Sequence, residues 1–383
     1  MLFRPPSLDE REHAVLQQIM EAKEKLRWQL HEPRRWAGSL RRLSFARAIQ
    51  GSNSIEGYDA ALDDAAAVAM GEEPLDAGTE TRRALEGYRD AMTYVLQLAN
   101  ETDFEYSGQL IKSLHFMMTS YALDNRPGRW RAGSIYVRKE ETGEIVHEGS
   151  DVDLVPELMR ELVEHLNQDN ELPDLVRAGM AHLNMVMIHP FRDGNGRMAR
   201  CLQSLVIARS GVLSPVFMSI EEYLGRNAQQ YYDVLAEVGG GTWQPQRDPR
   251  PWVRFTLTAH LRQARTMLQR ARDSELLWDQ LERLATERAL GERCVSALFD
   301  AALGMRIRNA TYRAIFEDGI TGGINEQTAT RDLRQLVNAN LLVPRGEKRG
   351  RYYVAGKEIV ALMREVVAAR NPRDETDPFA PPK

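Results

Sequence analysis

The chain has 383 residues, of which 43% are hydrophobic and 27% charged, and it carries a net charge of −5. This composition excludes a disordered or fibrous protein and indicates a globular one with two or three domains. The weak negative charge gives no overall attraction to nucleic acids or anionic membranes, so a contact with either would need a local basic patch.

Cysteine content and apolar patterning narrow the class further. The two cysteines, Cys201 and Cys294, lie far apart without metal-ligand spacing, which argues against a disulfide framework and against a zinc site. Residues 1–12 lack the apolar stretch of a signal peptide, and no apolar run approaches the roughly 20 residues that span a bilayer. We therefore expect a cytoplasmic protein without membrane contacts.

The N-terminal region, residues 1–100, is predicted to be helical. Two sets of apolar residues recur with helical spacing, and each set falls on one helix face. The sets are Val15, Ile19 and Leu26, and Leu85, Tyr88, Met92 and Val95. We expect these helices to serve as scaffold.

A small β-hairpin is predicted after residue 125. The sequence Arg126-Pro-Gly has turn chemistry, and two short β-prone runs, 135–137 and 145–147, are separated by Glu140-Glu-Thr-Gly.

Two further helices, at 154–166 and 176–187, are predicted before a sharp break. The second leads directly into His189, where Pro190 ends it because the residue before a proline disfavours the α conformation. A new helix is expected to begin near Asn195 and to stop at Gly211. Residues 189–200 should therefore lie at a helix–loop–helix junction.

The C-terminal part begins with a long helical segment from Pro251 to about Arg288. Residues 266–383 are divided into a helical linker at 266–290, a separate domain at 291–370 and a tail at 371–383. The tail holds four prolines and several charges with little to bury, so it is predicted to be disordered.

The order of elements in residues 291–370 is typical of a winged helix-turn-helix domain. A helix from Val295, a short helix at 311–316 and a recognition-type helix at 328–338 precede two β-prone runs that flank a wing tip at 346–350. Six basic residues face only two acidic ones between 331 and 351: Arg331, Arg334, Arg345, Lys348, Arg349 and Arg351. The patch is suited to the phosphate backbone of DNA, through Arg331, Arg334, Lys348 and Arg349. Contact with another protein, or with a second copy in a homodimer, is an equally open interpretation.

The most informative segment is His189-Pro-Phe-Arg-Asp-Gly-Asn-Gly-Arg-Met-Ala-Arg200. Arg197 and Arg200 fall on one face of the first helical turns, where the helix dipole is already positive. A polyphosphate would offset that charge, and Gly194 and Gly196 would let the backbone N–H groups approach it closely.

The other polar residues of the segment complete a plausible site. Asp193 is suited to Mg²⁺, which takes one or two carboxylates together with phosphate oxygens. Asn195 can orient a phosphate oxygen, and His189 is suited to act as a general base near neutral pH. Each residue alone has an ordinary structural explanation, but their combination favours a functional one.

The segment resembles the signature of Fic domain proteins, His-Pro-Phe-x-Asp/Glu-Gly-Asn-Gly-Arg-x-x-Arg, at nine fixed positions. The similarity extends over about 100–260 and implies a mainly α fold. It comprises a Fic-type helical core at 101–265 with a small β-hairpin flap, and we add the C-terminal winged helix-turn-helix domain.

The resemblance also implies an activity, protein adenylyl transfer: AMP passes from ATP, with Mg²⁺, to a Ser, Thr or Tyr hydroxyl of a target protein or of the chain itself. In that reaction His189 would take the hydroxyl proton and Asp193 would hold Mg²⁺. The nucleotide would be bound by Gly194, Asn195, Gly196, Arg197, Arg200 and Tyr232. The flap residues Ile135, Tyr136 and Val137 would pair with the target backbone.

A second motif, Ser52-Asn-Ser-Ile-Glu56-Gly57, resembles the inhibitory pattern Ser/Thr-x-x-x-Glu-Gly/Asn of many Fic proteins. It implies that Glu56 pairs with Arg200 and occupies the guanidinium that the γ-phosphate needs. The alternatives are a DNA-binding regulator that uses the Fic core as a nucleotide sensor, a Fic enzyme that transfers another phosphate-linked group, and one that removes AMP.

Overall fold

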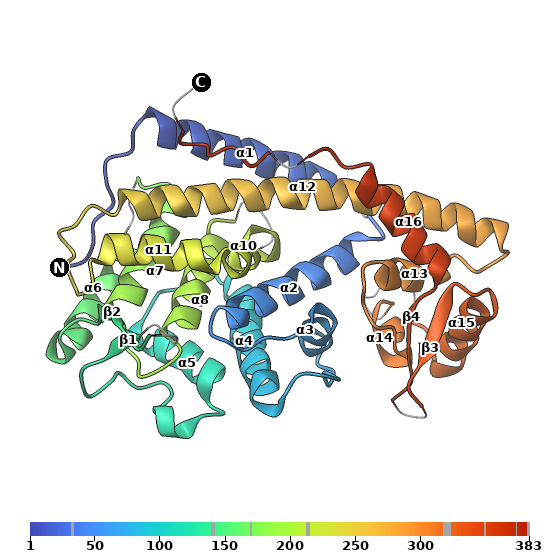
Figure 1. Cartoon of the computed structure of the whole chain (residues 1–383), viewed down its shortest axis with the longest axis horizontal. Coiled ribbons are helices and arrows are strands. Elements are labelled where there is room, and N and C mark those ends of the chain that lie inside the picture. Colours follow the sequence, from blue (N-terminus) through green and yellow to red (C-terminus); the bar gives the residue numbers. More distant parts are fainter. Residues whose placement is uncertain are drawn as a thin grey trace.

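The computed structural model describes residues 1–31, 34–138, 142–168, 171–211, 215–316, 323–347, 350–372 and 374–380. The fold is mainly helical with two small hairpins, which confirms the predicted class (Figure 1). The first part contains α1 (Glu10–His31), α2 (Ala37–Ser54), α3 (Leu62–Ala69), α4 (Thr79–Leu98), α5 (Gly108–Thr119), β1 (Tyr136–Arg138), β2 (Ile145–Glu148), α6 (Val155–Asn167), α7 (Asp174–Ile188) and α8 (Asn195–Arg209). The second part contains α9 (Pro215–Met218), α10 (Glu221–Arg226), α11 (Ala228–Gly239), α12 (Arg250–Glu287), α13 (Cys294–Ala302), α14 (Asn309–Ala314), α15 (Glu326–Asn338), β3 (Leu342–Arg345), β4 (Tyr352–Ala355) and α16 (Lys357–Ala368). Two single 3₁₀ turns lie at Leu123–Asn125 and Val152–Leu154.

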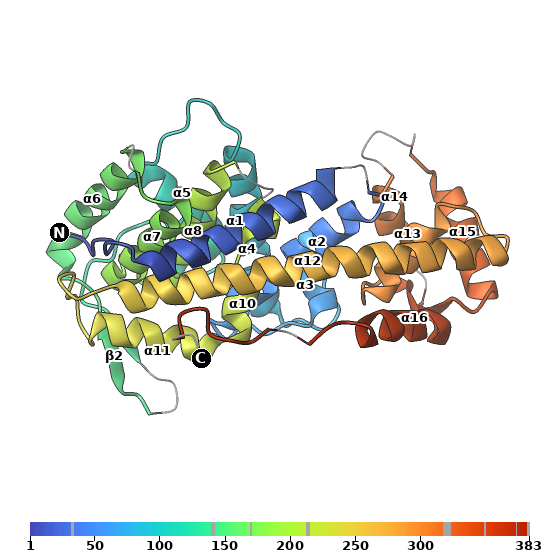
Figure 2. The ribbon, with the colours of Figure 1, turned by 90° about the horizontal axis from the view of Figure 1, so that it is seen from above.

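The long helices α1 and α12 lie side by side along one edge of the molecule (Figures 1 and 2). The face predicted for α1 is the one it buries, since Val15, Ile19 and Leu26 are each at most 1% exposed. No helix of the described chain is both long enough and apolar enough to span a bilayer.

Two hydrophobic cores organise the chain. The first joins α4 to α8 with α11 and the first half of α12, and includes Leu85, Leu183 and Leu205. The second joins the rest of α12 to the C-terminal helices, and includes Leu281 and Leu298. The first core positions the residues of the 189–200 segment, because α7 and α8 form its centre.

Helix α12 continues without a break through the segment expected to be a linker, 266–290. This half of the helix buries Met267, Leu277 and Leu281 in the second core. The segment therefore packs against residues 291–370, here called the C-terminal unit, rather than acting as a spacer, because that unit covers its apolar face.

The C-terminal unit places three helices before an antiparallel β3–β4 pair with Leu342 opposite Ala355. This order matches the one from which a winged helix was predicted, and that assignment stays a prediction. Lys348 and Arg349, two of the expected DNA contacts, lie outside the described residues.

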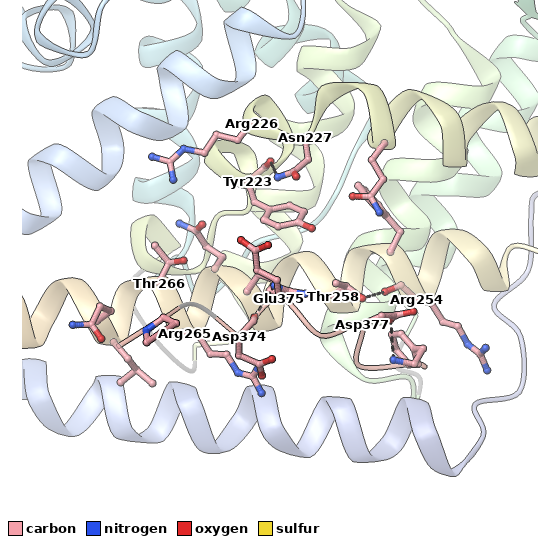
Figure 3. Close-up of a pocket in the computed structure, with 18 of the residues that line it drawn as sticks. Tyr223, Arg226, Asn227, Arg254, Thr258, Arg265, Thr266, Asp374, Glu375 and Asp377 are labelled. Carbon is pink, nitrogen blue, oxygen red and sulfur yellow. Dashed lines mark hydrogen bonds and ion pairs between the residues drawn. The ribbon is translucent and has the colours of Figure 1, made fainter. Parts of the chain in front are cut away.

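Residues 374–380 of the predicted disordered tail pack against α12 in the structure. Arg262 donates hydrogen bonds to the carbonyls of Asp374 and Thr376, and Phe379 is only 8% exposed in the first core. The tail borders a groove of about 1290 Å³ lined by α10, α11 and α12, and Asp374, Glu375 and Asp377 are among the residues that line it (Figure 3). The prediction differs here because it weighed the prolines and charges and missed the single aromatic anchor.

Candidate active site

The junction between α7 and α8 is formed by two left-handed backbone positions. His189 ends α7 with φ of 55°, and its N–H donates to the Met185 carbonyl. Gly194 precedes α8 with φ of 74°, where a side chain would also meet Thr119. Only glycine adopts this conformation freely, so the sequence Gly-Asn-Gly directs the chain into a tight loop.

The His189 imidazole is held in one tautomer. Its Nδ1 lies 3.0 Å from the Val186 carbonyl, which can only accept, so Nδ1 carries the proton and Nε2 keeps a lone pair. Burial lowers the pKa of His189 to about 4, and the hydrogen bond to Val186 opposes this only in part. The ring is therefore neutral at pH 7 and can accept a proton.

Both predicted arginines are buried, Arg197 at 0% and Arg200 at 1% exposure. The Arg200 guanidinium donates to the Ser52 hydroxyl at 2.8 Å and to the Ser52 carbonyl at 2.9 Å. Its Nη2 also contacts Glu56 Oε1 at 2.6 Å. Its Nη1 is buried and has no partner among the described residues, which leaves one donor available to an anion.

Glu56 is thus placed against Arg200. Burial alone would raise the pKa of Glu56, but the charges of Arg200 and Arg197 outweigh burial, so the net shift is downward and the carboxylate is ionised. A Cβ at position 196 would overlap this carboxylate, so a larger residue than glycine there would displace the end of the Glu56 side chain.

The loop after α2 keeps Glu56 in place. Gly57 turns the chain with φ of 80°, and Tyr232 on α11 donates to the Ile55 carbonyl at 2.7 Å. Tyr232, which was expected to contact the nucleotide, here supports the inhibitory segment. The ring of Tyr58 lies 5.1 Å from the Arg197 guanidinium.

Asp193 lies at the rim of the site with its side chain 40% exposed. Its Oδ2 accepts from the Asn125 amide at 3.2 Å and lies 3.7 Å from Arg197 Nη2. In the described part of the chain no group of three or more His, Cys, Asp or Glu side chains could hold a metal. A single accessible carboxylate fits Mg²⁺ only if phosphate oxygens and water supply most of its ligands.

Asn195 has a different role from the one expected of it. Its side chain is 2% exposed, accepts from the Phe191 N–H at 2.8 Å and donates to the Phe191 carbonyl at 2.9 Å. The amide is therefore used to close the loop around a buried Phe191, because a buried amide needs both partners.

Sequence reasoning missed two residues that support the loop. His115 Nδ1 accepts a hydrogen bond from the Gly128 N–H at 2.9 Å, so the ring proton is on Nε2, which donates to the Asp193 carbonyl at 2.8 Å. The His115 ring also stacks on the Phe191 ring, with 3.6 Å between the ring centres. Burial lowers the pKa of His115 to about 4, which fits this neutral form.

Arg131 is the second missed residue. It donates from Nε to the His189 carbonyl at 2.8 Å and from Nη1 to the Gly133 carbonyl at 2.7 Å. Its backbone N–H donates to the Pro190 carbonyl at 2.8 Å. No periodic signal distinguishes such an arginine, because its partners are backbone carbonyls and His189, the one in the candidate site, lies 58 residues away in the sequence.

The predicted hairpin lies beside His189. Tyr136 pairs with Glu148 and Val137 with His147, and His147 Nε2 lies 2.9 Å from the Met187 carbonyl at the end of α7. Tyr136 is 44% exposed, while Ile135 and Val137 are half-buried. Among the described strands β1 pairs with β2 alone, so its other edge is unpaired, and the His147 ring on β2 lies 6.4 Å from that of His189.

The arginines expected to contact DNA lie away from the candidate active site. Arg331 and Arg334 line a groove of about 580 Å³ along α15 in the C-terminal unit. The structure does not bring them to the 189–200 loop.

Part of the chain is similar in sequence to known proteins. Residues 105–207 match the model of the Fic/DOC family. The chain is 37% identical over 103 residues to protein adenylyltransferase fic-1 of Caenorhabditis elegans, covering 26% of the chain and 18% of that protein. It is 32% identical over 172 residues to protein adenylyltransferase Fic of Culex quinquefasciatus, covering 44% of the chain and 30% of that protein.

A solved Fic family protein from Desulfovibrio desulfuricans has a similar fold. Its TM-score is 0.58 at 22% sequence identity, covering 93% of this chain and 99% of that one. The matched segments span less than a third of each of these two relatives, so the relatives inform the matched part alone. Residues 105–207 of this chain therefore form a Fic domain.

Proposed function

We propose that the protein transfers AMP from ATP to a Ser, Thr or Tyr hydroxyl of a target protein and of itself. The observation that carries the proposal is a neutral His189 beside two buried guanidiniums, one of which has an unpaired donor among the described residues. Relatives named protein adenylyltransferase support the same reaction class.

In this reaction His189 Nε2 takes the proton of the target hydroxyl. The hydroxyl oxygen forms a bond to the α-phosphorus of ATP, the bond from that phosphorus to the bridging oxygen breaks, and pyrophosphate leaves with the electron pair. The N–H groups at the start of α8 and the Arg197 and Arg200 side chains stabilise the phosphate charge. Asp193 would hold Mg²⁺, which supplies additional neutralisation of phosphate charge when bound.

We further propose that Glu56 restrains this reaction. It occupies the guanidinium of Arg200, so the γ-phosphate cannot bind productively while the pair is closed. Breaking a buried pair from one side costs about 3–5 kcal/mol, and the 24% exposure of the Glu56 side chain places this pair toward the lower end. The resting rate is therefore low.

The exposed edge of β1 would receive the target segment by strand addition. Backbone pairing aligns the hydroxyl with His189 and demands little of the target sequence.

The test is intact-mass measurement of the Glu56→Gly variant after incubation with Mg²⁺ and each nucleoside triphosphate in turn. We expect a mass gain of one AMP with ATP, a much smaller gain in the wild type, and none in Glu56→Gly combined with His189→Ala. Equal labelling of wild type and Glu56→Gly would remove the role of Glu56. Absence of a gain with every nucleotide would remove the transferase proposal.

A further inference from the structure

The inhibitory segment is attached to the C-terminal unit on both of its sides. Helix α2 begins in the second core, where Trp36, Leu40 and Leu43 are buried. It ends in the first core, where Ile49 is buried and Ser52 holds Arg200. One helix of 18 residues, about 27 Å long, therefore links the C-terminal unit to the candidate active site (Figure 1).

The segment after Glu56 returns to the same unit. Arg306, between α13 and α14, lies 2.5 Å from Asp63 and 3.1 Å from Asp64, both at the start of α3. It also lies 3.1 Å from Asp76 in the loop after α3. Arg308 adds a contact of 3.2 Å to Glu72 in that loop.

Helix α2 itself has a polar contact with the unit. Arg42 lies 3.0 Å from Asp300 on α13. The C-terminal unit thus contacts residues 36–46 and residues 62–76. The segment between these two ranges carries Ser52 and Glu56, which bind Arg200.

The pair between Arg306 and Asp64 is less exposed to solvent than an ordinary surface pair. The Arg306 side chain is 14% exposed and that of Asp64 is 1% exposed, so water and salt screen their attraction less than at an open surface. The Arg306 guanidinium also lies 5.3 Å from the centre of the Tyr352 ring on β4. A movement of the C-terminal unit would therefore be transmitted to α2 and α3.

We propose that the C-terminal unit, residues 291–370, is a clamp that sets how firmly Glu56 holds Arg200. It keeps the segment closed in the resting protein, and its displacement withdraws Glu56 and Ser52 from Arg200 together. This inference rests on the proposed function, because Glu56 inhibits only if the site transfers a nucleotide.

The test compares two arginine substitutions of equal charge change. Arg306→Ala removes the contacts to α3, while Asp64 keeps its hydrogen bonds from the N–H groups of Leu75 and Asp76, so the segment remains foldable. Arg293→Ala is the control, because it breaks a 2.6 Å pair with Asp332 that lies entirely inside the C-terminal unit.

Two measurements are made on the full chain. The first is the rate of self-labelling from labelled ATP with Mg²⁺. We expect Arg306→Ala to raise it about fivefold or more, a typical coupling between sites, and Arg293→Ala to leave it near the wild-type rate. In the Glu56→Gly background Arg306→Ala should add nothing, because the restraint is already absent.

The second measurement, amide hydrogen exchange in residues 49–58, needs no transfer activity. We expect faster exchange in Arg306→Ala than in wild type and Arg293→Ala. Unchanged exchange in a folded Arg306→Ala protein overturns the clamp, as does an equal rate increase with and without Glu56. If the Glu56→Gly variant does not label itself, the proposed function is wrong. The hydrogen-exchange result then decides by itself whether the C-terminal unit holds the inhibitory segment. Arg308→Ala gives a milder variant should Arg306→Ala unfold.

Discussion

His189 combines two properties that a histidine at the protein surface lacks. Its backbone caps α7 in the left-handed conformation, and its Nδ1 is committed to the Val186 carbonyl. The free lone pair of Nε2 is therefore fixed in direction as well as in protonation state. The same geometry makes its titration a useful probe of the proposed reaction.

The pH profile of the activated Glu56→Gly variant should reflect the lowered pKa of His189, about 4. Because the base is neutral above its pKa, we expect the labelling rate per folded molecule to stay constant from pH 8 down to about 5 and then to fall about tenfold per pH unit below 4. Initial labelling rates against pH test this. A half-maximal rate near pH 6.5 would mean that His189 titrates as an exposed histidine, contrary to the expectation.

Arg131 should act as a positioning residue, since its guanidinium supports the His189 carbonyl. We expect Arg131→Ala in the Glu56→Gly background to lower the labelling rate about 10- to 100-fold, because small displacements of a reacting group are costly. The matched control is Arg129→Ala, an exposed arginine of the same loop. Similar rates for the two variants, with both folded, would contradict a role for Arg131.

At the scale of elements, the inhibitory helix α2 meets α10 backbone to backbone. A Cβ at Gly51 would lie 2.5 Å from the Glu221 carbonyl oxygen and 2.9 Å from the Glu222 Cα, neither of which can move as a flexible side chain would. We therefore expect Gly51→Ala to destabilise the fold by about 1–3 kcal/mol and to raise the labelling rate, since the end of α2 that carries Ser52 is displaced.

Gly38 offers the control in the same helix. A Cβ there meets only the end of the Arg42 side chain at 3.5 Å, so Gly38→Ala should stabilise α2 by up to about 1 kcal/mol and leave labelling unchanged. Urea denaturation with the labelling assay distinguishes the two variants. If the Gly51→Ala protein has the stability and the low labelling rate of the wild type, the contact between α2 and α10 at Gly51 is not tight.

Local signals were sufficient for several elements and insufficient for others. The break between α7 and α8 results from Pro190 and Gly194, whose backbone preferences act within a few residues. The continuity of α12 through 266–290 and the packing of Phe379 depend on surfaces supplied by distant segments. Hydrophobic period alone shows that a helix has an apolar face, but it does not show what covers that face.

At the scale of the whole molecule, buried histidines make the fold sensitive to acid. Burial lowers the pKa of His115 to about 4 and those of His182 and His260 to about 3. The unfolded chain binds protons at these sites below about pH 6.5, whereas the folded one stays neutral there, so these three sites lower the stability as pH drops through that range. At pH 5 each of these sites lowers the free energy of unfolding by on the order of 1–2 kcal/mol.

Thermal or urea unfolding between pH 8 and pH 5 measures this. We expect stability to decline below about pH 6.5, and His260→Gln to flatten the decline if the protein folds. His165→Gln, at an exposed position on α6, should leave the curve as it is. Constant stability down to pH 5 would contradict the neutral burial of these rings.

The sequence alone predicted a phosphate-binding loop at 189–200 and the helices on either side of it. Those features depend on backbone preferences and charges that lie close together along the chain. It also indicated Glu56 as a restraint, but only through resemblance, since nothing local joins residue 56 to residue 200.

The folded structure shows which groups surround the candidate site. It committed the Asn195 side chain to Phe191, turned Tyr232 toward Ile55, and brought in His115 and Arg131. These outcomes depend on hydrogen bonds between residues that are far apart in the chain. Such partners form only after the two cores have packed, because burial then requires each polar group to find one.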